Sequence, residues 1–551
     1  MPKKYTLGLD FGTLYARAMI VSTDGEIMGT AEHKYPHGVM EETLPNGIPL
    51  IKGFSLQHPL DYIEAIENII PKAIEAAGVN NSDIIGVGVD FTQCTMMPIL
   101  KDGTPLCLLK RFENNPYAYV KLWKHNTAQK QAQKMTEIAE QQGEEFLKYC
   151  GGRIYSETMF PKMLETLQCA PEVYTNADEF IELADWITFK LTGSKKRSAS
   201  IAACASMWTA KSGYPSVDYL SKLDADFGLA AQQKLSNDLV APSRIIGYIS
   251  DQVALKTGLK AGTPVAAGIG DSQAAFVGAG IIEEGTMLMV LGTSGCDMLI
   301  SEKGIPVKGM YGVTFNSIIP DMFGYEAGQA AVGDLLAWFV NNSVPKAYYD
   351  QARLHGITIF DYLNKLADKI NPAQSGLVAL DWWNGNRSIL LDSDLTGLII
   401  GLTLKTNCEE IYRALVESIA FGKRKIIEQL ETDGVKVNRL VATGGIASKN
   451  PFMMQVLADV IGIPIEVSTV DNGSCIGSAI YAAVAAGKKA GGFDSVQSAA
   501  KAMSGKIKCT YLPRAELKES YDKLYNVYEF LYSYFGKENS LMKQLKQINT
   551  N

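Results

Sequence analysis

The sequence predicts an α/β protein of two large domains, the second of which restates the opening of the first. The chain has 551 residues, too many for one ordinary hydrophobic core. Strand and helix patterns alternate after the first forty residues, and a β-hairpin like the one that opens the chain returns over residues 285–301. We therefore expect a duplicated domain. Gly, Pro and Lys interrupt the pattern near residues 255–263, so we divide the chain into residues 1–258 and 259–551.

The opening segment is expected to form a β-meander. Three strand-like runs, YTLGLDF, YARAMIVS and EIMGTAEHKY, are separated by short turns, and Asp24-Gly25 supplies the turn chemistry of a hairpin. A helix is predicted over about 59–77, ending at Gly78, and the apolar run DIIGVGVDF after it predicts a further strand. Strands that alternate with helices in this way are typical of α/β folds.

Composition and charge exclude several classes of function. A net charge of −7 and an isoelectric point near 5.5 give no electrostatic reason to expect binding to nucleic acid or to an anionic membrane. The N-terminus turns polar too early for a signal peptide, and no uninterrupted apolar run is long enough to span a membrane. Nine cysteines without a Cys-x-x-Cys spacing, and only five histidines, favour reduced thiols over a disulfide or zinc framework. We expect a cytoplasmic enzyme.

The first turn carries candidate ligands for the phosphates of a nucleotide. Asp10 ends the first strand, and Gly12 and Thr13 follow in a tight turn. A carboxylate at a strand end can hold hydrated Mg²⁺, and a glycine turn lets backbone N–H groups approach phosphate oxygens. Arg17 would add a bidentate phosphate donor. The segment is neither a P-loop nor the dinucleotide-binding fingerprint, and an ordinary hairpin turn is the alternative.

The mid-chain hairpin repeats this arrangement. In LGTSGC, the residues Gly292, Thr293 and Ser294 again bring hydroxyl and N–H groups to a turn between two strands. Such a turn occurs easily by chance, but a pair, one in each half, is more specific. We expect the two turns to face each other across a cleft.

A third glycine turn lies near the end of the chain. The predicted strand RLVAT runs into Gly444 and Gly445, and Asn450-Pro451 predicts a helix start with Asn as the N-cap. The positive end of that helix would suit the phosphate and ribose of a nucleotide. A strand–turn–helix joint with Gly for close packing is the alternative.

The segment GIGDSQAAF, residues 268–276, places Asp271 between two glycines and a predicted helix, where it either caps the helix or does chemistry. Together with Asp-Phe-Gly-Thr, Gly-Thr-Ser and Gly-Gly, this Asp resembles the pattern of the FGGY carbohydrate kinases, members of the actin-like ATPase fold. The resemblance covers nearly the whole chain, and KLWKH and DWWNGNRS are typical of the subgroup that phosphorylates L-ribulose. It implies two actin-like (ribonuclease H-like) domains flanking a catalytic cleft. Residues 1–258 would bind the sugar, and residues 259–551, with C-terminal helices, would bind ATP.

The same resemblance implies transfer of the γ-phosphoryl group of ATP, with Mg²⁺, to a primary hydroxyl of a ketopentose. Asp271 would be the general base, Glu326 would hydrogen-bond the sugar, and the backbone around Gln93 would touch it. Trp123 would form an apolar wall of the sugar pocket, with ordinary core packing as the alternative. Asp10 would hold Mg²⁺ through water. The remaining ATP-binding residues would be Gly12, Thr13, Arg17, Gly292, Thr293 and Ser294 at the phosphates, and Gly444, Gly445 and Asn450 at the adenosine. A homodimer is common among such relatives.

Four positions in the implied sugar pocket depart from the subgroup. Ala205 stands where a lysine reaches the sugar, Gln93 where a small residue is usual, and Ser272-Gln273 where Ala-His is usual. Gln93 and Gln273 can each donate and accept hydrogen bonds, so the pocket is suited to a changed substrate. L-ribulose is the first expectation, and D-ribulose, xylulose or a polyol are the alternatives. A non-catalytic actin-like ATP-binding regulator is the distant alternative.

Overall fold

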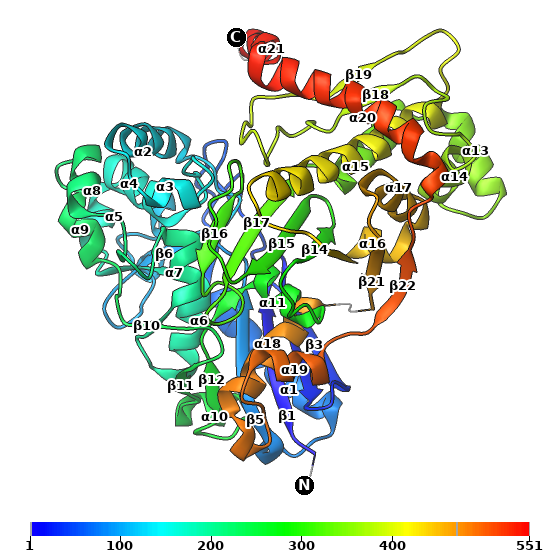
Figure 1. Cartoon of the computed structure of the whole chain (residues 1–551). Coiled ribbons are helices and arrows are strands. Elements are labelled where there is room, and N and C mark those ends of the chain that lie inside the picture. The colour runs from blue at the N-terminus through cyan, green and yellow to red at the C-terminus, as the bar shows by residue number, and fades with distance from the viewer. Residues whose placement is uncertain (1–2, 470–471, 550–551) are drawn as a thin grey trace.

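The computed structural model describes residues 3–469 and 472–549 (Figure 1). Two mixed seven-stranded sheets carry the fold. The first has the order β11 (Ile245–Tyr248), β12 (Pro264–Ala266), β5 (Ile84–Phe91), β1 (Tyr5–Phe11), β2 (Tyr15–Ser22) and β3 (Ile27–Lys34), with β13 (Ile269–Gly270) also paired to β5. The second has the order β16 (Gly312–Phe315), β17 (Phe323–Gln329), β15 (Gly295–Ser301), β14 (Thr286–Leu291), β20 (Arg439–Thr443), β21 (Ile465–Ser468) and β22 (Ile507–Tyr511).

The two sheets share one topology. In the first sheet, β1 of the antiparallel hairpin β1–β2 pairs in parallel with β5. In the second sheet, β14 of the hairpin β14–β15 pairs in parallel with β20. The outer strand of each hairpin pairs antiparallel with a third strand, β2 with β3 and β15 with β17. The order β3-β2-β1-β5-β12 thus recurs as β17-β15-β14-β20-β21. The predicted repetition, the opening meander and the mid-chain hairpin are confirmed.

The first sheet continues beyond residue 258. Strands β12 and β13 both pair with β5, so its last strand ends at Gly270. The division into residues 1–258 and 259–551 stays a prediction, and strand pairing favours a boundary further along the chain.

Three layers of helices cover the two sheets. The outer face of the first sheet packs against α1 (Pro59–Ala77), α6 (Leu183–Thr192) and α10 (Asp251–Thr257). A core between the sheets contains α11 (Asp271–Gly278), α18 (Gly473–Ala486) and α19 (Val496–Met503). The other face of the second sheet is covered by α12 (Gly333–Ser343), α14 (Ile359–Ala367), α15 (Cys408–Thr432), α17 (Pro451–Ile461) and α20 (Lys518–Ser533).

Helix α18 comes from the second half of the chain but lies on the first sheet (Figure 1). A Cβ atom built on Gly8 of β1 or on Gly88 of β5 would fall within 3.0 Å of the α18 backbone. These two glycines pair with each other in the parallel register, so side chains are absent where the helix presses closest. The contact ties the first sheet to the second half of the chain.

A further unit is inserted into the first half. It contains the small sheet β4 (Leu56–Gln57), β7 (Val120–Lys121), β6 (Met96–Ile99) and β8 (Glu179–Glu182), and it has a core of its own. Its helices are α2 (Gln129–Gln142), α3 (Phe146–Tyr149), α4 (Met159–Cys169), α5 (Pro171–Asn176), α7 (Ala199–Ser206), α8 (Val217–Leu223) and α9 (Gly228–Gln233).

The remaining elements are short or peripheral. They are β9 (Arg197–Ser198) with β10 (Leu239–Val240), β18 (Val378–Leu380) with β19 (Leu398–Ile400), α13 (Lys346–Leu354), α16 (Gly445–Lys449) and α21 (Leu541–Asn549). Among the described helices, none combines the length and the apolar character that a membrane crossing requires.

Candidate active site

Three carboxylates lie in a row at one edge of the first sheet. Asp10 and Asp90 are direct partners in the parallel pairing of β1 with β5. Asp271 follows Gly270 of β13, which pairs with Phe91 at the end of β5. The carboxyl ends of parallel strands meet at one edge, so the topology brings together three acids that are far apart in the chain. Ligands bind at such edges in open α/β sheets.

Asp90 is buried beside a second carboxylate. Burial raises its pKa well above the usual value, and the neighbouring carboxylate of Asp10 adds to the effect. Ser478 of α18 donates to Oδ2 of Asp90 over 2.6 Å, while Oδ1 accepts no hydrogen bond. Asp10, its direct partner in the strand pairing, is the nearest carboxylate to it in the row. Asp90 is not among the residues predicted from the sequence, although the repeated Asp-Phe at two strand ends was a signal.

Asp271 begins α11, and Gly270 before it is the N-cap, so Asp271 is not itself the capping residue. Its Oδ1 accepts from the backbone N–H of Ser272 at 2.7 Å and from the Ser272 hydroxyl at 3.2 Å. Burial, followed by the charge of Asp10, raises the pKa of Asp271 to about 7. A carboxylate whose pKa lies near the working pH is suited to accept a proton.

The first predicted phosphate turn, which carries Gly12 and Thr13, is held in place by contacts that cannot be read from the sequence. Gly12 N–H donates to the Tyr15 carbonyl across the turn at 3.0 Å. The Arg17 guanidinium is already paired, because it lies 3.1 Å from the Asp10 carboxylate and 3.0 Å from the Glu32 carboxylate. The guanidinium therefore partly neutralises Asp10. Its predicted contact with phosphate stays a prediction, and it requires one of these pairs to open.

Trp123 lies beside this turn. Its indole Nε1 donates to the hydroxyl of Thr13 at 3.1 Å, and the side chain is 44% exposed. The alternative that Trp123 is an ordinary core residue is therefore wrong. The Thr13 carbonyl accepts a second hydrogen bond, from Gln57 Nε2 at 2.7 Å. The inserted unit thus helps to fix the phosphate turn.

The second predicted phosphate turn, Gly292 to Ser294, contacts the first residues of α12. The Thr293 carbonyl accepts from the backbone N–H groups of Val332 and Asp334 at 2.8 and 3.1 Å, and the Gly292 carbonyl accepts from Gly333 at 3.0 Å. These contacts satisfy N–H groups at the start of α12 that would otherwise have no partner. Ser294 closes the turn, since its carbonyl accepts from Gly292 N–H at 3.0 Å.

The third glycine turn lies next to the second. Gly444 has φ of 98°, and a Cβ atom on it would stand 2.6 Å from the Leu291 carbonyl, which ends β14. Nothing lies within 4 Å of a Cβ atom on Gly445. Asn450 caps α17 as predicted, with its Oδ1 accepting from Met453 N–H at 3.0 Å. The phosphate turn and the predicted adenosine turn are therefore neighbours.

A polar cluster lies beside Gly270, the residue before Asp271. A Cβ atom on Gly270 would fall within 3.0 Å of the side chains of both Gln93 and Gln273. Gln93 Nε2 and Gln273 Oε1 are buried and have no hydrogen-bond partner among the described residues. Glu326 of β17 accepts from Arg387 at 2.9 Å, and the Gln273 side chain lies near its carboxylate. Burial raises the pKa of Glu326, while Arg387 opposes this effect.

Ala205 itself is fully buried in α7. The half-buried neighbour Cys204 makes the polar contacts instead, with its thiol near Gln93 and 3.5 Å from the Thr314 hydroxyl. The predicted contact between Ala205 and a sugar stays a prediction. Arg387, whose guanidinium stacks over the Tyr311 ring at 4.6 Å, is the cation nearest to Glu326. It belongs to the DWWNGNRS motif but is not among the predicted site residues.

Lys162 of α4 is a further residue that the sequence alone did not indicate. It is fully buried, and its ammonium donates to the carbonyl of Cys94 at 2.6 Å and of Leu122 at 2.8 Å. These carbonyls adjoin Gln93 and Trp123 in the chain. Cys94 adopts φ of 57°, an uncommon conformation for a residue with a side chain. Lys162 thus fastens two loops that carry predicted sugar-site residues.

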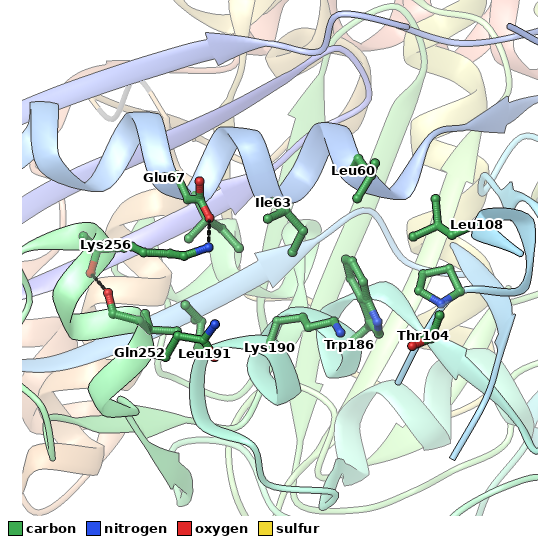
Figure 2. A pocket seen from close by; sticks show the side chains of 14 residues that line it. Leu60, Ile63, Glu67, Thr104, Leu108, Trp186, Lys190, Leu191, Gln252 and Lys256 are labelled. Carbon is green, nitrogen blue, oxygen red and sulfur yellow. Dashed lines mark hydrogen bonds and ion pairs between the residues drawn. The ribbon is translucent and has the colours of Figure 1, made fainter. Parts of the chain in front are cut away.

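A separate pocket of about 310 Å³ lies on the outer side of the first sheet, between α1, α6 and α10 (Figure 2). Leu60, Ile63 and Trp186 form its apolar walls, and the ion pair of Glu67 with Lys256, 2.7 Å long, borders it. None of the predicted site residues lines it. This pocket is therefore distinct from the carboxylate row.

Comparison with known proteins identifies the family. Residues 5–278 match the model of the FGGY family of carbohydrate kinases, N-terminal domain, and residues 287–486 match that of its C-terminal domain. The chain belongs to the FGGY family of carbohydrate kinases. It is a phosphotransferase with an alcohol group as acceptor, and the family uses ATP as phosphate donor. The alternative of a non-catalytic regulator is set aside.

Curated relatives indicate which kind of carbohydrate kinase the chain resembles. The ribulokinase of Anoxybacillus flavithermus is 44% identical over 548 residues, 99% of this chain and 97% of the relative. The ribulokinase of Bacillus licheniformis is 45% identical over 535 residues, 97% of each chain. The chain is thus a ribulokinase-like sugar kinase.

Two solved kinase structures share the fold. A xylulose kinase from Rhodospirillum rubrum superposes with a TM-score of 0.76 at 21% identity, over 96% of this chain and 98% of the other. A gluconate kinase from Lactobacillus acidophilus gives 0.78 at 18% identity, over 97% and 99%. Proteins named for different sugars share this architecture, so the fold confirms the two actin-like domains but does not select the substrate.

Proposed function

We propose that this kinase transfers the γ-phosphoryl group of ATP to a primary hydroxyl of a ketopentose, L-ribulose in the first place, with Asp271 as the general base. The observation that carries the proposal is the position of Asp271. Its carboxylate has a pKa of about 7, begins a helix at the edge of the first sheet, and is close enough to Asp10 and Glu326 to feel their charges. The names of the curated relatives support ribulose as the substrate.

In this proposal Asp271 accepts the proton of the attacking hydroxyl. Its Oδ1 is held by Ser272, which leaves Oδ2 to face the substrate. Glu326, oriented by Arg387, accepts a hydrogen bond from another sugar hydroxyl. Phosphoryl transfer needs positioning and charge neutralisation more than covalent help, so one base and a set of donors are sufficient.

ATP and Mg²⁺ would occupy the turns and the carboxylate row. Hard cations such as Mg²⁺ prefer oxygen ligands, and the Asp10 carboxylate at the edge of the first sheet offers them. We propose that Asp10 holds Mg²⁺ through water, and Mg²⁺ would supply neutralisation of phosphate charge. Thr13, Thr293 and Ser294 would bind phosphates with Gly12 and Gly292, aided by Arg17, while Gly444, Gly445 and Asn450 would bind adenosine.

The two glutamines suggest how the pocket reads its sugar. Gln93 Nε2 is a donor and Gln273 Oε1 an acceptor, and their side chains meet over Gly270. One hydroxyl both donates and accepts, so a single sugar hydroxyl that reaches both groups satisfies them. Leaving them unpaired costs about 1–3 kcal/mol each. The two groups, Gln93 Nε2 and Gln273 Oε1, form a slot that takes the place of the lysine contact that Ala205 cannot make. D-ribulose, xylulose and polyols therefore stay as competing substrates.

The test is ADP release by the purified full chain with a panel of pentuloses, hexuloses and polyols. We expect L-ribulose to give the highest kcat/KM. A higher value for another ketose or polyol would replace the substrate but keep the chemistry, whereas no acceleration by any acceptor would overturn the proposal.

A matched pair of variants tests the slot. Gln93→Ala and Gln273→His restore the residue types usual in the subgroup, and each removes one of the two orphaned groups. We expect the KM for the best sugar to rise by on the order of 10-fold, with the KM for ATP unchanged. An equal change in both KM values would show that the glutamines do not read the sugar.

The location and the oligomeric state of the protein remain proposals. We propose a cytoplasmic homodimer, which sedimentation of the purified protein and fractionation of the source cells would test. The absence of a long apolar helix among the described residues is compatible with this location.

A further inference from the structure

Two histidines and an aspartate converge at the start of α1, outside the carboxylate row. His37 follows β3, while His58 and Asp61 stand at the N-terminus of α1. One ligand atom from each of the three side chains lies within 4.8 Å of the other two. The chain has only five histidines, and two of them meet here.

The contacts leave one group of this cluster without a partner. Asp61 accepts from the His37 backbone N–H at 3.0 Å, and its other oxygen lies 2.6 Å from His37 Nδ1. The His58 ring stacks on the His37 ring with 4.4 Å between centroids. His58 Nδ1 is buried without a hydrogen-bond partner among the described residues, and the side chain does not cap α1. A buried polar atom of this kind needs an explanation, and a bound ion is one.

We propose that His37, His58 and Asp61 bind a divalent transition metal of the zinc class. Two imidazole nitrogens and one carboxylate oxygen are ligands that Zn²⁺ takes, with further positions left to solvent. The His37 side chain is 39% exposed, which gives the ion a path from solvent. Two ligand atoms on a tetrahedral zinc lie roughly 3.3 Å apart, so the His37–Asp61 contact opens slightly as the metal replaces the shared proton.

The site differs in chemistry and place from the one proposed for Mg²⁺. Mg²⁺ prefers oxygen ligands alone, so nitrogen ligands select against it. The residue before His58, Gln57, donates to the Thr13 carbonyl and accepts from the Tyr62 hydroxyl at 2.6 Å. A metal bound here sits one residue from the contact that holds the first phosphate turn.

Titration of the chelator-treated full chain with Zn²⁺ by calorimetry, and with Co²⁺ by visible absorption, tests the proposal. We expect one ion per chain and a Co²⁺ spectrum of low-symmetry coordination, both unaffected by excess Mg²⁺. His58→Ala should weaken Zn²⁺ binding at least about 10-fold, while His355→Ala, which removes an exposed histidine at the end of α13, should leave it unchanged.

Unchanged affinity in His58→Ala, or an equal loss in His355→Ala, would overturn the proposal, as would the absence of Zn²⁺ binding to the wild type. His37→Ala is the second variant in case His58→Ala lowers the thermal midpoint of the metal-free protein. It removes a partly exposed ligand, and wild-type affinity in it would also overturn the site.

Discussion

Replacing Asp271 with Asn should make this kinase slower and more stable at the same time. Asn keeps the size of the side chain but cannot accept the proton of the attacking hydroxyl. A general base contributes about 10²–10⁴ in rate, so we expect kcat to fall by that factor while ATP binding persists.

The stability gain follows from the raised pKa. The usual value is 3.8 and the folded value about 7, so the folded state binds more protons than the unfolded state between these values. Folding stability of the wild type therefore falls as pH rises through this window, and the full cost is present above pH 7. Three pKa units correspond to about 4 kcal/mol, an upper limit because solvent reaches part of the side chain. We expect Asn to recover about 2–4 kcal/mol at pH 8 and roughly half of that at pH 5.5.

Urea unfolding of both proteins at pH 8 and 5.5, alongside ADP release, measures the two effects. The control is Asp251→Asn, because Asp251 also begins a helix but is exposed. Equal stability of Asp271→Asn and wild type at pH 8, or a gain that does not shrink at pH 5.5, would refute the reasoning about burial. Near-normal turnover would refute the assignment of the base.

Three other changes separate the parts of the site. Gly444→Ala should raise the KM for ATP at least about 10-fold, because φ of 98° and the Leu291 carbonyl at 2.6 Å leave no room for a Cβ atom, whereas Gly445→Ala should change it little. Equal effects of the two changes would contradict this. Glu326→Gln should raise the KM for the sugar but not for ATP, as initial-rate kinetics will show, and the reverse pattern would place Glu326 on the nucleotide side. Lys162→Met should lower the free energy of unfolding by about 3 kcal/mol or more, because two buried carbonyls lose their donor. It should also raise the KM for the sugar. A loss of stability with an unchanged KM would show that the lysine supports the fold alone.

Elements specified by local chemistry could be predicted from the sequence. The opening strands, the helix ending at Gly78 and the helix capped by Asn450 were predicted nearly to the residue. Each depends on a short pattern: alternation between turns, a glycine with φ of 62° after the last helical residue, or an Asn oxygen that accepts from a helix N–H. The repeated hairpin likewise revealed the duplicated topology, because the same strand order requires the same local signals twice.

Electrostatics and close packing were decided only by the tertiary structure. The pKa of Asp271 depends on burial and on Asp10, which parallel strand pairing brings near. The raised pKa of Asp90 depends on burial beneath α18, a helix from the other half of the chain, and on the nearby carboxylate of Asp10. Lys162 gains its role because two loops distant in sequence turn their carbonyls toward one buried ammonium. The sequence by itself determined which residues could do chemistry and which segments present them, because these follow from residue type and local pattern. Only the tertiary structure decided which of them are charged, neutral or unpaired, because those states depend on what neighbours burial brings to each group.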